Sequence, residues 1–366
     1  MEELIRIEFL SMYKDKIKEE ETYKEFLSSF TKDSLERLFK MNALITNDSK
    51  ELAKAYLISN KNKKEIMEEL EKQNKKIYSN LLKNADEMMI KQLEYYLKSY
   101  QKNLMVIQLN QLRISLHFIS FLNENCLAKV NYSKSKKTVT LETPSELRKL
   151  LGNIIKDKKI IKNSKKIRIE KEQIHNLIAT YGVILLSDLC KIYNKVYRKE
   201  TRDSLLDKII ISQIYEDEIQ IAPVEDDYMI YGISFEDEDD ALSFYYSLDE
   251  KLDYKIYNKE EYKEIGEAEY FTGIEEYGKV YHYLEKLFSN KEEEINDFIE
   301  AMIIDYIFSY QIDEEEADSN YQKNIKRGYP NIKEKERKEL LKRIKVLASY
   351  YPNYRNKGYS DQEIKK

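Results

Sequence analysis

The sequence predicts a mainly α, multi-domain helical protein that carries two small winged-helix-like β-hairpins. Three observations lead to this fold class. The 366 residues exceed what one small domain needs, since a domain usually takes about 100–200 residues. Only eight glycines and four prolines leave little material for a turn-rich all-β fold. Apolar residues recur mostly at three- and four-residue steps, which is the spacing of a helix face.

Changes in pattern and composition divide the chain into five segments. We expect a helical region over residues 1–100, a winged-helix-like unit with a basic hairpin over 103–155, and a basic linker over 156–169. A second winged-helix-like unit with an acidic hairpin is expected over 170–250, followed by a helical region with a basic tail over 251–366.

The first segment is expected to be helical because side chains that can cap a helix stand before apolar runs. Thr31–Ser34 and Thr46–Ser49 offer oxygen atoms that can accept hydrogen bonds from the free amides of a first turn. Two short helices are therefore predicted. A long Lys/Glu-rich helix should follow over about 62–78, supported by opposite charges three and four residues apart.

A further helix is expected to open the second segment. Its apolar face consists of Met105, Leu109, Leu112, Leu116, Ile119 and Leu122. Arg113, His117, Ser120 and Glu124 share another face of this predicted helix. That face is the candidate for reading bases if the target is DNA, although the charge of Glu124 would be repelled by the phosphate backbone.

A basic hairpin should follow this helix. The β-type runs Leu127–Asn131 and Lys137–Leu141 flank the turn-like stretch Tyr132–Lys136. The tip would carry Lys134, Lys136 and Lys137. Pro144 then starts another helix, since proline is tolerated in a first turn. A helix followed by a basic hairpin is part of the winged-helix arrangement.

The Lys/Ile-rich stretch 156–169 lacks clear caps, so a linker or an extra strand is expected there. Three helices and a second hairpin should follow. The helix signals are an apolar row from Ile174 to Tyr181 broken at Gly182, a start at Leu186–Leu189, and a cap at Thr201–Ser204. Two strands, 218–221 and 228–231, flank the acidic turn Pro223–Asp227.

The charges are strongly segregated along the chain. Residues 129–172 hold 14 Lys and Arg against five Asp and Glu, and residues 321–366 repeat that ratio. Residues 214–300 hold only seven Lys and Arg against 27 Asp and Glu. Like charges repel within a block and attract between blocks. One interpretation is that the acidic half docks on the basic parts or is solvated beside them. The alternative is that the basic parts bind nucleic acid or an acidic partner.

Signatures of catalysis and metal binding are absent. The sequence has no Walker loop, nucleophile elbow or His-Glu-x-x-His motif, and His117, His175 and His282 stand alone. Cys126 and Cys190 are too few for a disulfide framework or a zinc site. We expect a non-enzymatic protein without cofactor or metal. With no long apolar run and no secretion signal, we also expect it to be cytoplasmic and to have no membrane partner.

The leading functional hypothesis is a nucleic-acid-associated, regulatory protein that binds DNA or RNA. Lysines on a wing reach phosphates, and phosphate neutralisation supplies most of the sequence-independent affinity. The candidate nucleic-acid-binding residues are Arg113, His117, Lys134, Lys136, Lys137, Lys165, Lys166 and Arg168. A solvated Lys-rich hairpin is the structural alternative.

A second hypothesis assigns the function to the acidic half, where 23 of the 31 tyrosines also lie at or after Tyr181. This half would occupy a basic nucleic-acid site on a partner complex, as a mobile-element or phage inhibitor of a host defence complex would. The candidate partner-binding residues are Glu225, Asp226, Asp227, Glu236, Asp237, Glu238, Asp239 and Asp240. The run Glu236–Asp240 also has a simpler interpretation as a solvated helix start.

Parts of the chain resemble known proteins. Thr31–Leu57 resembles the SAP-like or Rho-N-terminal-like helix pair, which implies nucleic-acid binding. Ile178–Asn194, Pro144–Leu147 and Asn353–Ile364 are similar to segments of uncharacterised proteins of low-GC Gram-positive bacteria that end in a SEC-C zinc motif. The tryptophan usual before Gly182 and the SEC-C cysteines are missing here, so the resemblance implies no zinc site.

Overall fold

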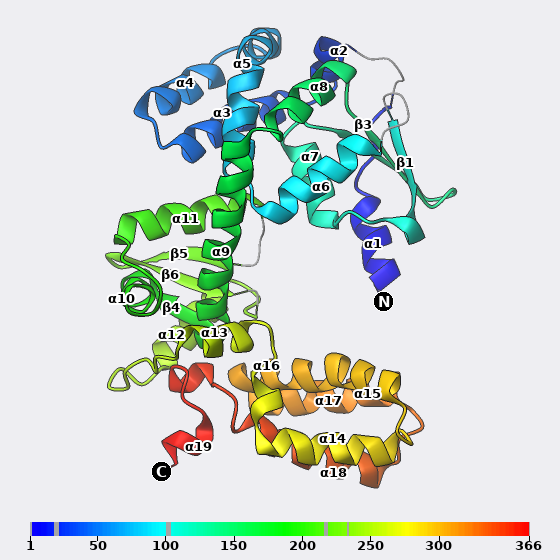
Figure 1. Cartoon of the computed structure of the whole chain (residues 1–366), viewed down its shortest axis with the longest axis vertical. Coiled ribbons are helices and arrows are strands. Elements are labelled where there is room, and N and C mark those ends of the chain that lie inside the picture. The colour runs from blue at the N-terminus through cyan, green and yellow to red at the C-terminus, as the bar shows by residue number, and fades with distance from the viewer. Residues whose placement is uncertain (1, 18–21, 100–103, 216–218, 233, 366) are drawn as a thin grey trace. The chain divides into compact units, whose positions relative to one another are not determined.

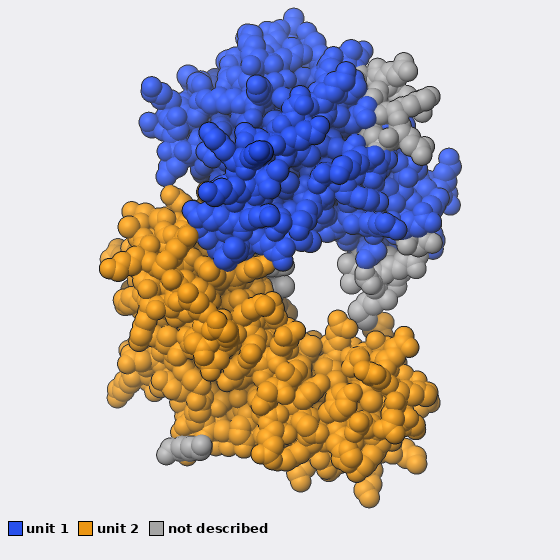
Figure 2. All heavy atoms as spheres, in the orientation of Figure 1, with its two compact units in different colours: residues 1–170 blue, residues 171–366 orange. Residues whose placement is uncertain are grey.

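The computed structural model describes residues 2–17, 22–99, 104–215, 219–232 and 234–365, and of residues 2–5, 110, 214 and 215 it describes the backbone alone. The chain forms two compact units, residues 1–170 and residues 171–366 (Figure 2). Helices make up most of the structure, and the named strands form two three-stranded antiparallel sheets (Figure 1). The prediction of a mainly α fold is thereby confirmed.

The first unit begins with six helices. They are α1 (Glu2–Leu10), α2 (Tyr23–Ser28), α3 (Lys32–Thr46), α4 (Ser49–Ser59), α5 (Lys63–Lys83) and α6 (Glu87–Lys98). A sheet region follows with β1 (Leu104–Gln108), η1 (Leu109–Gln111), α7 (Leu116–Glu124), β2 (Lys129–Ser133) and β3 (Thr138–Glu142). The helix α8 (Ser145–Ile154) comes next, and α9 (Lys158–Tyr181) continues into the second unit.

The capping signals predicted these first helices correctly. Thr31 accepts a hydrogen bond from the Ser34 amide at the start of α3, and Asp48 accepts one from the Lys50 amide at the start of α4. Asn62 and Glu65 form a reciprocal capping box at the start of α5. These bonds satisfy amides that have no partner within the helix.

The prediction of a single helix from Met105 to Leu122 is wrong in its first half, because residues Leu104–Gln108 form the strand β1. Met105 and Ile107 are buried whereas Val106 is exposed, so the pattern has a period of two. A four-residue step between apolar side chains fits a strand as well as a helix, and this explains the error. The helix α7 starts only at Leu116, after Ser115 caps the Phe118 amide.

The sheet of the first unit has the strand order β1-β3-β2. The hairpin β2–β3 confirms the predicted basic hairpin, and its turn places Lys137 in the left-handed region with φ 49°. An N-terminal stretch covers the outer edge of β2. There the Asp15 amide donates to the Val130 carbonyl and the Tyr132 amide donates to the Tyr13 carbonyl, with N–O distances of 3.1 Å each.

The stretch 156–169, expected to be a linker or an extra strand, is helical from Lys158 onward because it forms the first half of α9. Ile160 and Ser164 are both buried and lie one helical turn apart, so one face of this half of the helix is buried. The missed start signal is Asp157, whose carboxylate accepts a hydrogen bond from the Lys159 amide at 2.8 Å. Gly182, with φ 70°, follows the helix end, as predicted.

The second unit continues with β4 (Val183–Leu185), α10 (Leu186–Val196), α11 (Arg202–Tyr215), β5 (Ile219–Val224) and β6 (Asp227–Gly232), in a sheet of order β4-β6-β5. The predicted helix starts at Leu186 and after Thr201 are confirmed. The predicted hairpin is confirmed as well, although Glu218, the first residue of its predicted first strand, lies outside the described residues. The turn between β5 and β6 consists of Glu225 and Asp226, so this hairpin has an acidic tip.

The rest of the second unit is helical, as expected. Its elements are α12 (Glu238–Ser247), α13 (Lys259–Gly266), η2 (Tyr270–Gly273), α14 (Glu275–Leu287), α15 (Glu292–Phe298) and η3, a π-helical stretch (Ile299–Ile304). The chain ends with α16 (Asp305–Ile312), α17 (Glu314–Gly328), α18 (Glu334–Ala348), η4 (Tyr354–Asn356) and α19 (Asp361–Ile364).

Tyrosine is a main component of the core of the second unit. One apolar cluster extends from the end of α9 to α18 and includes the fully buried Tyr181, Tyr193, Tyr262, Tyr306 and Tyr351. Within the described residues, none of the helices combines the length and the apolar character that crossing a bilayer requires.

Candidate partner-binding pocket

A pocket of about 450 Å³ lies on the second unit beside the β5–β6 turn. We call it the acidic pocket. Its walls come from β4 and α10 (Leu185, Asp188), the turn and its flanks (Val224, Glu225, Asp226, Asp227), the end of α12 and the segment after it (Tyr245, Tyr246, Leu248, Glu250, Tyr254), and the C-terminal segment (Lys357). Pockets of this size accommodate a side chain or a small ligand.

The β5–β6 turn is fixed in place by Asp227. Its carboxylate accepts hydrogen bonds from the Ser187 amide at 3.2 Å and from the guanidinium of Arg202 at 2.6 Å. Arg202 also donates to the carbonyl of Asp226. Partial burial opposes ionisation of Asp227, but the hydrogen bonds from Ser187 and Tyr228 and the charge of Arg202 prevail, so the pKa of this carboxyl lies below its usual value.

Three tyrosines, Tyr245, Tyr246 and Tyr254, also line the acidic pocket. The rings of Tyr245 and Tyr246 lie 5.6 Å apart between centroids, and Tyr254 packs edge-on against the buried Tyr181 at 5.1 Å. Burial raises the pKa of the Tyr254 hydroxyl above its ordinary value. The ammonium of Lys357 lies 5.1 Å from the centroid of the Tyr254 ring. The pocket thus already holds one cation of the chain against an aromatic face.

The carboxylates of the acidic pocket are not fully neutralised. Asp188 is paired with Lys191 at 2.8 Å and Asp227 with Arg202. Glu225, Asp226 and Glu250 are exposed and form no ion pair with any residue that the structure describes. Unpaired carboxylates beside tyrosine rings attract a cation electrostatically and offer it a flat face to lie on. The arrangement is therefore suited to an ammonium or guanidinium group.

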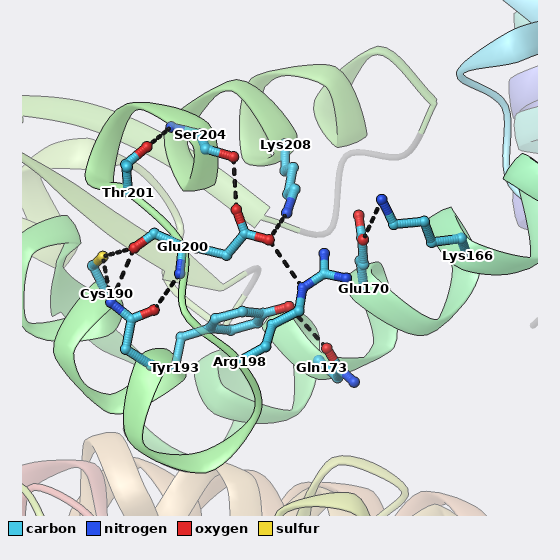
Figure 3. Close-up of polar contacts among 11 residues, drawn as sticks. Lys166, Glu170, Gln173, Cys190, Tyr193, Arg198, Glu200, Thr201, Ser204 and Lys208 are labelled. Carbon is cyan, nitrogen blue, oxygen red and sulfur yellow. Dashed lines mark hydrogen bonds and ion pairs between the residues drawn. The ribbon is translucent and has the colours of Figure 1, made fainter.

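A polar cluster around Glu200 holds the connection between α10 and α11 (Figure 3). The carboxylate of Glu200 accepts hydrogen bonds from Lys208 at 2.5 Å and from Ser204 at 2.8 Å, and it pairs with Arg198 at 2.9 Å. The backbone of Glu200 exchanges two hydrogen bonds with the side chain of Asn194. This cluster orients the start of α11, from which Arg202 reaches the β5–β6 turn.

The run Glu236–Asp240, the other part of the predicted acidic surface, lies at the start of α12. All five residues are exposed, and Asp237 caps the helix by accepting a hydrogen bond from the Asp240 amide. Carboxylates at this position are favoured by the positive end of the helix dipole. None of the five lines the acidic pocket, whereas Glu225, Asp226 and Asp227 do.

The predicted basic residues do not form one surface. Lys134, Lys136 and Lys137 are exposed at the tip of the β2–β3 hairpin. Lys165, Lys166 and Arg168 lie on α9, where Lys166 pairs with Glu170 and Arg168 with Glu87. Figure 1 shows the hairpin tip and the first half of α9 in separate parts of the first unit.

The predicted base-reading face is divided as well. Arg113 precedes α7 and is exposed, while the Nε2 atom of His117 is buried and has no hydrogen-bond partner among the described residues. Ser120 donates to the carboxylate of Glu124, which also pairs with Arg37 of α3. The polar face of α7 therefore makes contacts within the first unit.

Of the residues that line the acidic pocket, sequence reasoning singled out only Glu225, Asp226 and Asp227. The missed polar and aromatic residues are Asp188, Tyr245, Tyr246, Glu250, Tyr254 and Lys357, and the apolar Leu185, Val224 and Leu248 were missed as well. They come from segments as far apart as α10 and the C-terminus, and only folding brings them together. The sequence signal for these residues was the surplus of carboxylates and tyrosines after residue 181. That surplus indicated the acidic half of the chain but not which of its residues line the pocket.

The comparisons with known proteins identify no relative, since no family model, curated protein or solved structure matches the chain. The described residues contain no group of three or more His, Cys, Asp or Glu side chains that could hold a metal ion. Cys126 is buried and Cys190 half-buried, and burial raises the pKa of both thiols.

Proposed function

We propose that the protein is a non-enzymatic interaction protein that binds a basic segment of a partner at the acidic pocket. The observation that supports this function best is that one pocket combines several tyrosines with three exposed carboxylates that form no ion pair with the described residues. Nucleic-acid-handling proteins expose lysine and arginine for phosphates, so a protein of this class is the expected partner. Acidic surface would then compete with nucleic acid for the same basic site.

The side chains of the acidic pocket have different roles in binding the basic segment. Glu225, Asp226 and Glu250 attract the basic segment, and the ring of Tyr246, which is exposed, offers a surface for its aliphatic stems. Asp227 and Arg202 keep the turn in position. Arginine and tyrosine are both enriched at the residues that dominate binding energy in protein interfaces, which agrees with an arginine of the partner inserted among these rings.

The test uses the full-length protein and a fluorescent arginine-rich dodecapeptide as the probe. The triple variant Glu225→Gln, Asp226→Asn, Glu250→Gln removes three charges and keeps size and polarity. The matched control is Glu292→Gln, Glu293→Gln, Glu300→Gln, three exposed carboxylates outside the pocket. We expect the pocket variant to lose at least about tenfold in affinity, since close charge pairs contribute about 1.5 kcal/mol or more.

The control variant should lose far less, because its carboxylates act only at long range and are screened by salt. Equal losses in the two variants would show that the peptide senses the net charge alone. That result would reject the pocket as the binding site.

A second proposal keeps the nucleic-acid hypothesis for the basic hairpin. Lys134 and Lys136 are exposed at its tip and form no ion pair with the described residues. The elements around it, α6-β1-η1-α7-β2-β3 with β1 beside β3, follow the order of a winged helix, and so do α9-β4-α10-α11-β5-β6. Winged helices often use the hairpin to contact phosphates, and the likeness of α3–α4 to SAP-like modules supports the same role.

A further inference from the structure

The sheet of the first unit has two different edges. The outer edge of β2 is covered by residues 13–15, which add backbone hydrogen bonds to Val130 and Tyr132. In the part of the chain that the structure describes, β1 pairs with β3 alone, and Figure 1 shows β1 at the outside of the sheet. One edge is thus protected by the chain itself while the other is open to a further strand.

The hydrogen-bond pattern shows which backbone groups the open edge offers. The Leu109 amide donates to the Lys137 carbonyl at 2.9 Å, and this bond sets the alternation along the antiparallel pair. Met105 and Ile107 then face β3 with their backbone groups, whereas the N–H and C=O groups of Val106 point outward. The side chain of Val106 is 61% exposed. No lysine or proline, which natural proteins use to block such edges, occurs in Leu104–Gln108.

A groove of about 660 Å³ follows this edge. Tyr95 of α6, Val106 and Leu112 give it apolar walls, and Arg113 stands at its rim. Arg113 is exposed and has no ion pair among the described residues. A free guanidinium beside an open strand edge favours an acidic ligand, because it can bind a carboxylate with two parallel hydrogen bonds.

We propose that the β1 edge binds an extended, apolar segment of a partner protein that carries an acidic residue. The segment adds a strand to the sheet through the outward groups of Val106, places an apolar side chain between Tyr95 and Leu112, and pairs its carboxylate with Arg113. Main-chain hydrogen bonds supply affinity in this mode of recognition, and the pocket beside the edge supplies specificity. The site is separate from the acidic pocket and takes a ligand of opposite charge.

The experiment begins with a random octapeptide library selected on the full-length protein, followed by affinity measurements on the enriched peptide made synthetically. We expect alternating β-branched or aromatic residues together with one Asp or Glu. The variant Val106→Pro removes the outward amide, which makes no bond to β3, and proline is tolerated on an edge strand. It should weaken binding at least about tenfold, whereas Val106→Thr, which keeps the amide, should bind normally.

Two further measurements do not depend on how the proline variant folds. Two versions of the peptide are compared, one N-methylated at its odd-numbered residues and one at its even-numbered residues. Only one of the two should lose binding, since only alternate amides of the added strand face β1. Arg113→Glu should reverse the preference, so that a peptide with Lys in place of its acidic residue binds better. Enrichment of helical peptides, or equal binding by wild type, Val106→Pro and Arg113→Glu, would overturn the proposal. A dimer in sedimentation that Val106→Pro abolishes would assign the edge to a second copy of the chain instead.

Discussion

The ring of Tyr354 lies directly against Gly182, so that a β-carbon on this glycine would come within 2.6 Å of the Cγ atom of the ring. Gly182 adopts φ 70° at the end of α9, and Tyr354 is only 2% exposed. Nearby, the Tyr257 hydroxyl donates to the carbonyl of Gly358 at 2.6 Å. The segment around Gly182 therefore contacts the C-terminal segment around Tyr354 and Gly358. The C-terminal segment stabilises the start of the second sheet.

The first prediction follows from this contact. Gly182→Ala should lower the free energy of unfolding by about 2–5 kcal/mol, because it combines a left-handed backbone with overlap of the Tyr354 ring. Gly152→Ala is the matched control, since a β-carbon at this position in α8 meets no atom within 4 Å. It should be neutral or stabilise by about 0.5–1 kcal/mol. Urea unfolding of both variants measures the difference, and a similar stability of the two would contradict the packing.

A second prediction concerns the buried ion pair of the first unit. The ammonium of Lys129 lies 3.8 Å from the carboxylate of Glu142, and both side chains are 1% exposed. Lys129 also lies 5.5 Å from the ring centroid of Phe26. Lys129→Met would remove the ammonium beside the buried carboxylate of Glu142 and should cost about 3–5 kcal/mol.

The double variant Lys129→Met, Glu142→Gln removes both charges and should recover part of that stability. Thermal unfolding of the wild type, both single variants and the double variant forms the required cycle. If the loss of stability in the double variant equals the sum of the losses in the two single variants, the two charges do not interact across this sheet.

Local signals in the sequence were sufficient to locate α3, α4 and α5. Thr31, Asp48 and Asn62 each cap a helix, and a cap acts within one turn, so neighbouring residues determine the outcome. The same reasoning failed for β1 because apolar residues four apart, as Met105 and Leu109 are, fit both periodicities. It failed for the start of α9 because the cap is a single Asp157 in a lysine-rich stretch.

Long-range features could not be predicted in this way. Nothing near Tyr254 in sequence indicates that its ring faces Lys357, which lies more than one hundred residues later. The acidic pocket depends on such contacts between β4, α12 and the C-terminus. Charge segregation did predict that carboxylates would dominate this part of the molecule, because the surplus is too large to be paired internally.

The third prediction concerns alkaline unfolding. Burial raises the pKa of Tyr354 to about 12, and it raises the pKa of Tyr181 and Tyr306 beyond the usual range. The folded state therefore favours the neutral phenol. Its contribution to stability is complete below the ordinary tyrosine pKa of about 10 and is lost as the pH rises through the folded-state values.

Phenolate absorbance should consequently rise in two stages. Exposed tyrosines ionise first without a structural change, and the buried set ionises later, together with the loss of helical circular dichroism. Refolding on return to neutral pH serves as the control for chemical damage. A single titration near pH 10 with the helices intact would show that these tyrosines are accessible to water.

The fourth prediction tests the basic hairpin. Lys134→Glu with Lys136→Glu should weaken binding to all DNA and RNA sequences alike and should lower the slope of log affinity against log salt by about two. The matched control is Lys335→Glu with Lys342→Glu, two exposed lysines of α18. Fluorescence anisotropy at several salt concentrations gives both slopes. Binding that is unchanged in the hairpin variant, or absent at low salt, would reject this role.

The fifth prediction separates long-range attraction from contact in the acidic half. Replacing Glu236, Asp237, Glu238, Asp239 and Asp240 by Gln or Asn removes five exposed charges at the start of α12, while Asn at position 237 still caps the helix. These residues lie outside the acidic pocket, so they can act on a basic partner only through the electrostatic field. The association rate should fall and become less sensitive to salt, and the dissociation rate should stay the same.

The pocket variant Glu225→Gln, Asp226→Asn, Glu250→Gln should behave in the opposite way. Its carboxylates contact the bound segment, and losing a contact mainly accelerates dissociation. Stopped-flow association and dissociation rates with the arginine-rich peptide, measured across ionic strength, distinguish the two effects. If the five-residue variant dissociates faster as well, the start of α12 belongs to the contact surface. If its association rate matches the wild type at every salt concentration, the run serves only as a solvated helix start.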